Sequence, residues 1–580
     1  MLSSLGVSYN RRYDRFGDVK DINSAIRQLS KALSSISRDS TQRPAILSSL
    51  GNAYGCHFER YGERRDLDFA IEKTLEAATT SPLKGADRAG IFNNLGNHYL
   101  CCFDWFGDIQ DLYSANKHQL EAVASIPLNH PGQPTILDGL GLTHWHHFER
   151  FGTRKDINSA VEQQLKAAAS TPLKSVHRPR IIMNLGKSYQ CRFEWFENIQ
   201  DLEYAIKHLH EAATSISPDD PLRLMNLNYL GISYQQHFNR FGKKNDIDSA
   251  IKVQLEAVTS APPDHPDRAM YLNSLGGSYY NRFVRFGGMN DIDSAIKHFL
   301  EAVASLLPNS NKLASHLYNL GAAYSGRFSY SGDVRDIDSA IEQLRKAVPS
   351  IPLDSFMRPN YLVNLGISYH SRFLHFGEVK DIDQAIKLLL EATSPKNVKR
   401  TGHLHCLQCL GKSYLSRFLR FGEMKDIDEA IKLLREAVSS TPIDSPDRPI
   451  FVHDLGSAYS FRFIHSGDMK DIDLAIKAQV EAVDSIPVDS SKRSERVSVL
   501  AVSYLDRFKR SRDAEDLDSA IKHSREAVAS SKFAAPNVLP FVSNNLGTCY
   551  QHRFDLFGEV KDIDLAIEKK VKLVDTISDH

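Results

Sequence analysis

The chain has 580 residues, 42% hydrophobic and 24% charged, a composition typical of a folded soluble protein and not of a disordered one. Lys plus Arg and Asp plus Glu both number 71, so the formal net charge is zero and no nucleic-acid partner is expected. The sequence has neither a run of eighteen apolar residues nor a secretory signal, which predicts a cytoplasmic protein without a membrane partner. Seven Cys, an odd number, fit a reducing compartment better than a disulfide framework.

The dipeptide Leu-Gly recurs along the whole chain. It occurs at 5–6 and every 45 residues up to 455–456; Leu500-Ala501 replaces it once, and it returns after 46 residues at 546–547. Thirteen copies therefore fill the chain as a single array and leave no room for a separate catalytic domain. The predicted repeats are residues 1–39, 40–84, 85–129, 130–174, 175–219, 220–264, 265–309, 310–354, 355–399, 400–444, 445–489, 490–535 and 536–580.

Each copy predicts two helices, as the copy over residues 40–84 illustrates. Apolar residues recur at helical spacing between 46 and 58, and the aromatic-Gly pair at 61–62 is expected to end this helix A of roughly 17 residues. Asp66, which has a counterpart in all thirteen copies, is interpreted as the N-cap of a second helix, helix B. Helix B carries Ala70 and Ala77 and is expected to end near Pro82.

A helix-turn-helix hairpin cannot bury both of its faces alone, so thirteen of them are expected to stack. The predicted fold class is all-α, a right-handed α-solenoid. Leu-Gly-x-x-Tyr in helix A, followed by the two Ala and the Pro of helix B, resembles the tetratricopeptide repeat. That family repeat has 34 residues, and the 45-residue unit is similar to long tetratricopeptide arrays of mushroom-forming fungi, often followed by a caspase-like CHAT protease domain. The chain starts and stops inside a repeat, which is interpreted as a possible fragment.

Three candidate chemistries are weighed against structural interpretations. An Arg precedes Phe near the end of helix A in nine copies; it either binds acidic ligands or, as we favour, pairs with the Asp that opens helix B. Cys406 and Cys409, with His403 and His405 nearby, are half a metal site at most, and no metal is predicted. His147 stands at the Arg position of its copy, so it is interpreted as part of the scaffold. No nucleophile constellation or phosphate loop is found, so neither an enzyme nor a cofactor is expected.

The positions that vary between copies are expected to carry function. The resemblance implies that helix A lines a concave groove, where Asn pairs with both groups of a peptide backbone; some of these Asn are alternatively expected to bond to the neighbouring helix. The candidate partner-binding residues are Asn93, Asn94, Asn97, Trp145, His146, Asn184, Lys187, Asn228, Asn273, Tyr280, Asn319, Asn364, Lys412, Asn544 and Asn545.

The sequence thus predicts a non-enzymatic scaffold that binds a peptide or protein along the face of the A helices. The alternative is the sensor arm of a CHAT-type protease whose catalytic part lies outside this chain.

Overall fold

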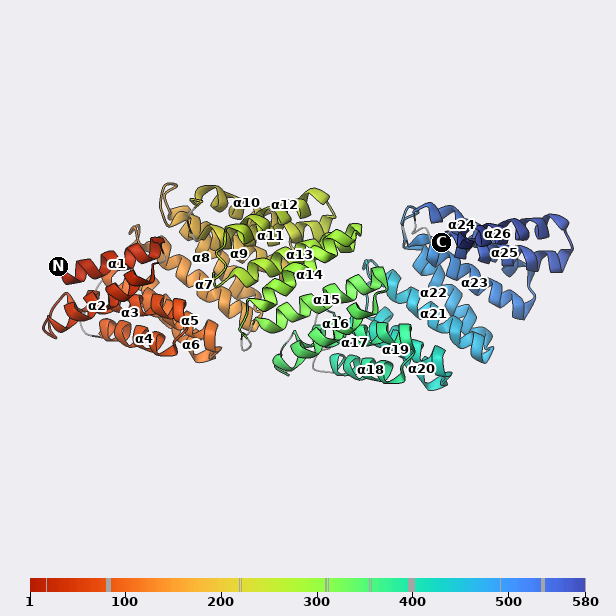
Figure 1. Ribbon diagram of the computed structural model, residues 1–580, viewed down its shortest axis with the longest axis horizontal. Coiled ribbons are helices and arrows are strands. Elements are labelled where there is room, and N and C mark those ends of the chain that lie inside the picture. Colours follow the sequence, from red (N-terminus) through yellow and green to blue (C-terminus); the bar gives the residue numbers. More distant parts are fainter. Residues whose placement is uncertain are drawn as a thin grey trace. The chain divides into compact units, whose positions relative to one another are not determined.

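The computed structural model describes every residue except 17, 80–84, 219, 221, 308–309, 311, 354, 356, 395–401, 491, 534–537 and 579–580. The described residues form 26 α-helices and no strand, so the chain is an all-α solenoid of thirteen helical hairpins, each an odd-numbered helix followed by an even-numbered one (Figure 1). They belong to two compact units, Met1–Ser305 with α1–α14 and Leu306–His580 with α15–α26.

The odd-numbered helices correspond to the predicted A helices. Their bounds are α1 Leu2–Phe16, α3 Arg43–Tyr61, α5 Gly85–Phe106, α7 Gln133–Phe151, α9 Arg178–Phe196, α11 Leu222–Phe241, α13 Arg268–Phe286, α15 Leu313–Ser331, α17 Arg358–Phe376, α19 His403–Phe421, α21 Arg448–Ser466, α23 Arg493–Ser511 and α25 Val538–Phe557.

The even-numbered helices correspond to the predicted B helices. Their bounds are α2 Val19–Ser34, α4 Arg64–Thr79, α6 Ile109–Ser125, α8 Arg154–Ser170, α10 Ile199–Ser215, α12 Lys244–Ser260, α14 Met289–Ala304, α16 Val334–Ala347, α18 Val379–Ala392, α20 Met424–Ser439, α22 Met469–Asp484, α24 Ala514–Ser530 and α26 Val560–Ser578. Short 3-10 turns follow α16 at Val348–Ser350 and α24 at Ser531–Phe533. Pro82, near which helix B of its copy was expected to end, lies outside the described residues; Pro127, at the equivalent position of the next copy, follows the end of α6.

Glycine ends most of the odd-numbered helices, and a second glycine lets them pack tightly on their partner helices. Gly62 caps α3 with φ of 71°, in the left-handed region that was predicted for it. The Gly of each Leu-Gly pair faces the even helix of its own hairpin: a Cβ on Gly411 would lie 2.8 Å from Cγ of Leu434. The repeated Gly is therefore a packing requirement of the hairpin.

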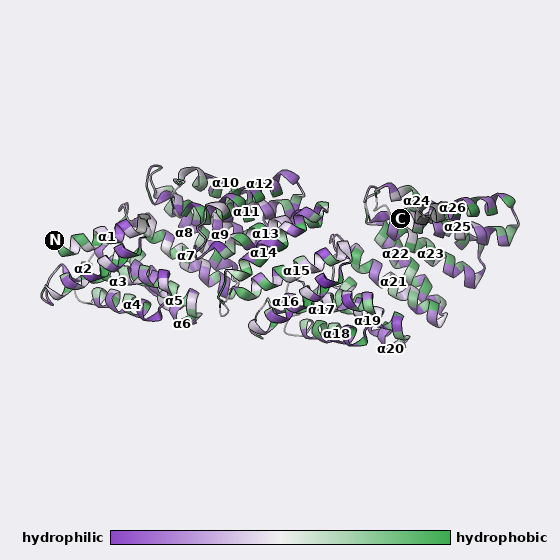
Figure 2. Ribbon diagram, viewed as in Figure 1, coloured by the Kyte–Doolittle hydropathy of each residue, from purple (hydrophilic) through white to green (hydrophobic). Residues whose placement is uncertain are grey.

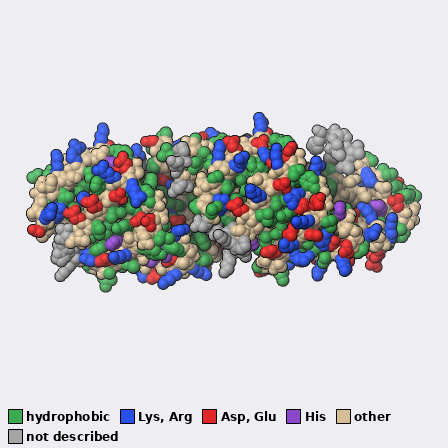
Figure 3. All heavy atoms as spheres, turned by 90° about the horizontal axis from the view of Figure 1, so that it is seen from below, with side chains coloured by type: hydrophobic (Ala, Val, Ile, Leu, Met, Phe, Trp, Pro, Cys, Tyr) green, Lys and Arg blue, Asp and Glu red, His purple; other side chains and the backbone are tan. Residues whose placement is uncertain are grey.

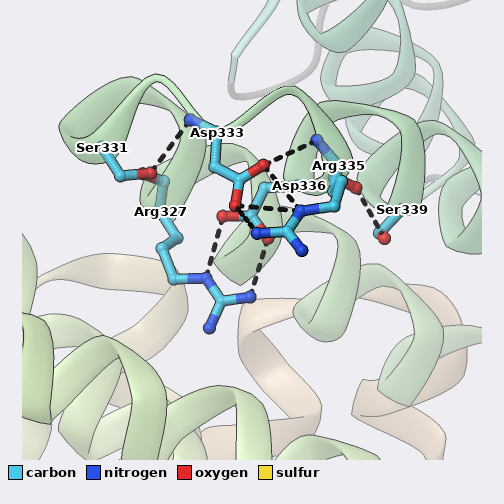
Figure 4. A network of polar contacts seen from close by, with 6 residues as sticks. All are labelled: Arg327, Ser331, Asp333, Arg335, Asp336 and Ser339. Carbon is cyan, nitrogen blue, oxygen red and sulfur yellow. Dashed lines mark hydrogen bonds and ion pairs between the residues drawn. The ribbon is translucent and has the colours of Figure 1, made fainter.

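The prediction that an Arg pairs with the Asp at the start of helix B is confirmed. In Figure 4, Arg327 donates from Nε and Nη2 to both carboxylate oxygens of Asp336, at 2.9 and 2.7 Å. The same pair occurs in all nine copies that have the Arg, and His57, His147 and His237 take its place beside Asp66, Asp156 and Asp246. These pairs, here called the Arg–Asp ladder, join the two helices of each hairpin and belong to the structural scaffold.

The prediction that this Asp is the N-cap of helix B is wrong. The N-cap of α16 is Asp333, whose carboxylate accepts the backbone N–H of Arg335 at 3.0 Å, while Asp336 lies in the first turn. The side chain and backbone of Arg335 lower the pKa of Asp333 to about 2 (Figure 4). Asp18, Asp108, Asn198, Asp468 and Asp513 cap their helices in the same way. The repeated Asp was mistaken for the cap, but it recurs for another reason: in twelve copies it pairs with an Arg or a His of the odd-numbered helix before it.

Charged contacts also join successive hairpins. Arg282 pairs with Asp291 of its own hairpin and donates from Nη1 to Asp248 of the preceding one at 2.8 Å. At the start of α9, Arg178 donates to two carbonyl groups at the end of α8 and to Glu211 of α10.

Hydrophobic (green) and hydrophilic (purple) residues alternate along the ribbons in Figure 2, and Figure 3 shows basic and acidic side chains interspersed over one face. The zero net charge therefore arises from basic and acidic side chains that lie close to each other on the surface.

Each odd-numbered helix also contacts the next odd-numbered helix within its unit, whereas the described even-numbered helices have no comparable contact with each other. The second residue after the repeat Gly, a small buried one in most copies, permits this approach; Ser368 of α17, for instance, bonds Ser325 of α15 through the hydroxyl groups at 2.9 Å. The odd-numbered helices thus form a continuous layer in each unit, whose surface we call the odd-helix face.

Candidate functional site

A cavity of about 430 Å³ opens on the odd-helix face of the N-terminal unit. Its walls come from α1, α3 and α5, with one residue each from α4 and α9. The lining residues are Val7, Asn10, Arg11, Ser49, Asn52, Gly55, Cys56, Glu59, Leu67, Asn94, Asn97, His98, Cys101 and Arg180. Four Asn among them include two of the predicted groove residues, Asn94 and Asn97. The cavity offers amide donors and acceptors together with charges of both signs.

His98 is the wall residue that sequence reasoning missed. Its ring lies against Gly55, since a Cβ on that Gly would come 2.9 Å from Cε1 of His98. The side chain is 8% exposed, and burial lowers its pKa to about 4, so the ring is neutral at pH 7. Its Nε2 atom is buried and has no hydrogen-bond partner in the protein. The sequence does single out His98 by its position, the second residue after the repeat Gly. In every other copy the residue at this position is Ser, Ala, Thr or Cys.

Asn10 provides a second unsatisfied group in this wall. Its Nδ2 donates to the carbonyl oxygen of Ser49 at 3.2 Å, but its buried Oδ1 has no partner in the protein. Buried polar atoms are rarely left without a partner, because their desolvation is then uncompensated. Asn10 and His98 therefore mark this cavity as a place that a polar ligand would complete.

Several predicted groove Asn are instead bonded to the neighbouring odd-numbered helix. Asn184 donates to both carboxylate oxygens of Asp138, at 3.1 and 3.0 Å, and Asn94 donates to Oγ of Ser48 at 3.1 Å. Asn545 makes the equivalent bond to Ser498 at 3.0 Å. In each pair, the second residue before one Gly meets the third residue before the preceding Gly or Ala. These amides serve the stacking of hairpins, the alternative weighed from the sequence.

Burial also removes two further Asn from an open groove. Asn228 is 0% exposed and neither of its side-chain polar atoms has a hydrogen-bond partner in the protein. Asn93 is buried as well, with its backbone carbonyl accepting from Gln119 at 3.3 Å. Asn97, by contrast, is exposed beside the cavity, and its Oδ1 accepts from Nε2 of Gln119 at 2.9 Å.

The remaining predicted Asn and Lys412 lie outside this cavity. Asn273, Asn319, Asn364 and Asn544 are partly buried on their odd-numbered helices, and Lys412 is exposed on α19. Tyr280 is partly buried on α13, and its burial raises the pKa of its hydroxyl. The predicted residues therefore lie on odd-numbered helices of both units and are not gathered into one site.

Trp145 belongs to the hydrophobic core, which corrects the expectation that it lines an open groove. It is 7% exposed and packs in one cluster with Phe148 and Ile157. The ammonium group of Lys187 lies 3.4 Å from the centre of its ring, a cation–π contact that occupies the remaining face. His146 is partly buried and faces carboxylates, with Nδ1 3.1 Å from Oδ1 of Asp104.

The Cys pair of α19 is buried. Burial raises the pKa of Cys406 to about 11 and that of Cys409 to about 12, so both thiols are protonated at pH 7. Nε2 of His405 lies 3.6 Å from Sγ of Cys409. No group of three His, Cys, Asp or Glu side chains within the described ranges is arranged to hold a metal ion. None of the described helices is both long and apolar enough to span a bilayer.

The sequence matches no family model and no curated protein. Similar solved structures include the human IFIT1 dimer with PPP-AAAA, at 16% identity and a TM-score of 0.43, over 80% of this chain and 87% of that one. The APC/C hetero-tetramer Cut9–Hcn1 is similar at 14% identity and a TM-score of 0.36, over 91% and 93%. A STAND protein with a tetratricopeptide repeat sensor from Pyrococcus horikoshii follows at 13% and 0.45, over 79% and 65%. The likeness concerns the helical-repeat fold alone.

Proposed function

We propose that the chain is a non-enzymatic scaffold that binds a peptide or protein partner along the odd-helix face. The observation that supports this most is the cavity of the N-terminal unit, where Asn10 Oδ1 and His98 Nε2 are buried without a hydrogen-bond partner in the protein. A polypeptide backbone supplies an N–H donor and a C=O acceptor at every residue. Four Asn and a neutral His around one cavity match both kinds of group.

Preorganisation favours binding at this face. The side chains lie on helices that are fixed by the Arg–Asp ladder and by contacts between odd-numbered helices, so little conformational entropy is lost when a partner binds. The thiols near the face are poor nucleophiles, since burial raises the pKa of Cys102 and of Cys191 to about 12. These features support binding over covalent catalysis.

The zero net charge of the chain does not exclude a nucleic-acid partner. Arg11 and Arg180 line the same cavity, so a chain of zero net charge still carries basic groups at one place. The expectation of no nucleic-acid partner is therefore not supported, and an oligoribonucleotide belongs among the ligands to be tested.

A displayed library of random peptides tests the proposal. Selected peptides would be measured against the wild-type chain, against Asn52→Ala with Asn97→Ala on the odd-helix face, and against Asn23→Ala with Gln110→Ala. The last pair removes two amides from the exposed surface of α2 and α6 as a matched control. We expect the odd-helix pair to weaken binding about tenfold, the cost of about 1.4 kcal/mol from two hydrogen bonds, and the control to change it less than about twofold. Equal effects of the two pairs, or binding of an oligoribonucleotide and of no peptide, would contradict the proposal.

A further inference from the structure

The first five hairpins of the N-terminal unit carry a carboxylate at the same repeat position, beginning with Asp14 of the first copy. Glu59, Asp104, Glu149 and Glu194, here called the acidic row, each stand eight residues after the repeat Gly on α3, α5, α7 and α9, and all four are exposed. These helices contact one another in succession. In the C-terminal unit the same position holds a carboxylate only in the last copy, Asp555, and an exposed aliphatic side chain in three of six copies: Leu374, Leu419 and Ile464 are 66%, 53% and 62% exposed.

The acidic row is unfavourable for the scaffold itself. Each member lies in the last turn of its helix, where the negative end of the helix dipole disfavours an anion by about 0.3–1 kcal/mol. The aliphatic residues of the C-terminal unit show that the fold does not need a carboxylate at this position. Four such placements in a row therefore require a reason outside the stability of the helices.

The carboxylates of the acidic row crowd each other. Nδ1 of His146 lies 3.1 Å from Oδ1 of Asp104 and 3.9 Å from Oε2 of Glu149, so two of them share one imidazole. Although these carboxylates are exposed, desolvation by the surrounding protein raises the pKa of Glu149; Lys187 and His146 lower it in part, and the charges of Asp104 and Glu194 raise it further. Desolvation also raises the pKa of Glu194. A cation placed among them would relieve this repulsion.

Unpartnered hydrogen-bond acceptors accompany the acidic row. Nε2 of Gln236, on α11, donates to Oε1 of Glu194, and Gln190 lies one helical turn before Glu194 within hydrogen-bonding reach of it. Gln190 is only 6% exposed, and the Oε1 atoms of both Gln are buried without a hydrogen-bond partner in the protein. The cation closest in sequence, Lys187, has its ammonium group 3.4 Å from the ring centre of Trp145. Acceptors thus exceed donors around Glu194.

We infer that the acidic row binds a basic segment of a partner polypeptide, with Arg side chains donating to Asp104, Glu149, Glu194 and the two free Gln oxygens. A metal ion does not fit, because no three acidic, His or Cys side chains among the described residues converge closely enough. A guanidinium group has five N–H donors in a plane and spans separated carboxylate and amide oxygens. The inference rests on the proposed function, because it names the class of partner that the odd-helix face would bind.

A direct test uses fluorescent Gly/Ser peptides that carry either Arg or Glu at spaced positions. Their binding would be measured by anisotropy with the wild-type chain and with the triple variant Asp104→Asn, Glu149→Gln and Glu194→Gln, which keeps shape and removes charge. The control Glu72→Gln, Glu162→Gln and Glu203→Gln changes the net charge equally on the exposed surface of α4, α8 and α10. Circular dichroism would verify that both variants keep the helical fold.

We expect the wild-type chain to bind the Arg peptide and not the Glu peptide, with an affinity that falls as salt is added. The row variant should bind the Arg peptide at least about tenfold more weakly, a loss of about 1.4 kcal/mol, and the control should stay within about twofold of wild type. No binding of the Arg peptide, or an equal loss in both variants, would overturn the inference. If library peptides without basic residues bind the odd-helix face, the proposed function stands and this inference fails. If no peptide binds that face, both fail.

Discussion

The Arg–Asp ladder allows one side chain to be tested against two partners in different surroundings. Arg372 donates from Nε and Nη2 to Asp381 at 2.9 and 2.7 Å, and from Nη1 to Asp338 of the preceding hairpin at 2.8 Å. The side chain of Asp381 is 3% exposed and that of Asp338 is 56% exposed. Arg372→Met keeps most of the aliphatic stem and removes the charge, and Asp338→Asn removes only the exposed partner.

The two variants should differ in magnitude because the two carboxylates differ in burial. Loss of Arg372 leaves a buried charge at Asp381 without its partner, a defect that costs about 3–5 kcal/mol. Loss of the exposed charge at Asp338 should cost about 0–1 kcal/mol, as is usual for surface pairs. The cation–π contact of Arg372 with Tyr369, at 5.4 Å, adds a smaller part to the first figure.

Native-state hydrogen exchange is the suitable assay, because a long array does not unfold in a single two-state step. We expect amides of α17 and α18 to exchange roughly 10²–10⁴-fold faster in Arg372→Met and no more than about fivefold faster in Asp338→Asn. Helices α21 and α22 serve as an internal reference in each spectrum. Equal acceleration by both variants would refute the argument that burial of Asp381 sets the value of this pair.

Three other predictions concern single positions. Burial raises the pKa of Asp138 from 3.8 to about 6, so its contribution to stability is full below pH 4 and is lost as pH rises through 6. Asp138→Asn should therefore stabilise the fold at pH 7 by up to about 3 kcal/mol and flatten urea midpoints measured between pH 4 and 7. Arg512 caps α23 at φ of 62°, and Arg512→Gly should raise local stability by about 1 kcal/mol, seen as slower exchange in α23. Gly411→Ala would press a methyl group onto Leu434 and should lower the thermal midpoint through a cost of about 1–3 kcal/mol; an unchanged midpoint would contradict this.

Regularity made the architecture predictable from the sequence. Helix ends and hairpins recur in nearly every copy and the Arg–Asp pair in nine of thirteen, and a feature that recurs must satisfy the same local geometry each time. Gly62 in the left-handed region and the pairing of Arg327 with Asp336 follow from such recurrence. The same reasoning failed for the N-cap, because Asp336 recurs for its Arg partner while the true cap, Asp333, varies between copies.

The site was less predictable because it depends on which odd-numbered side chains meet across hairpins. Asn184 was expected to face a ligand, but the register between α7 and α9 brings it to Asp138. His98 was overlooked because its role depends on the space left by Gly55 in the preceding hairpin. Both outcomes are set by contacts between residues more than 40 positions apart, which a single repeat does not reveal.

Carboxyl footprinting can show which helices a bound partner covers, since it reports on the odd-numbered and even-numbered helices in one experiment. The chain would be labelled with a carbodiimide and an amine, with and without the bound Arg peptide, and each carboxylate would be quantified by mass spectrometry. We expect protection of Asp104, Glu149 and Glu194 on the odd-numbered helices and unchanged labelling of Glu162 and Glu203 on the even-numbered ones. Protection of the even-numbered helices with full labelling of the acidic row would contradict this expectation.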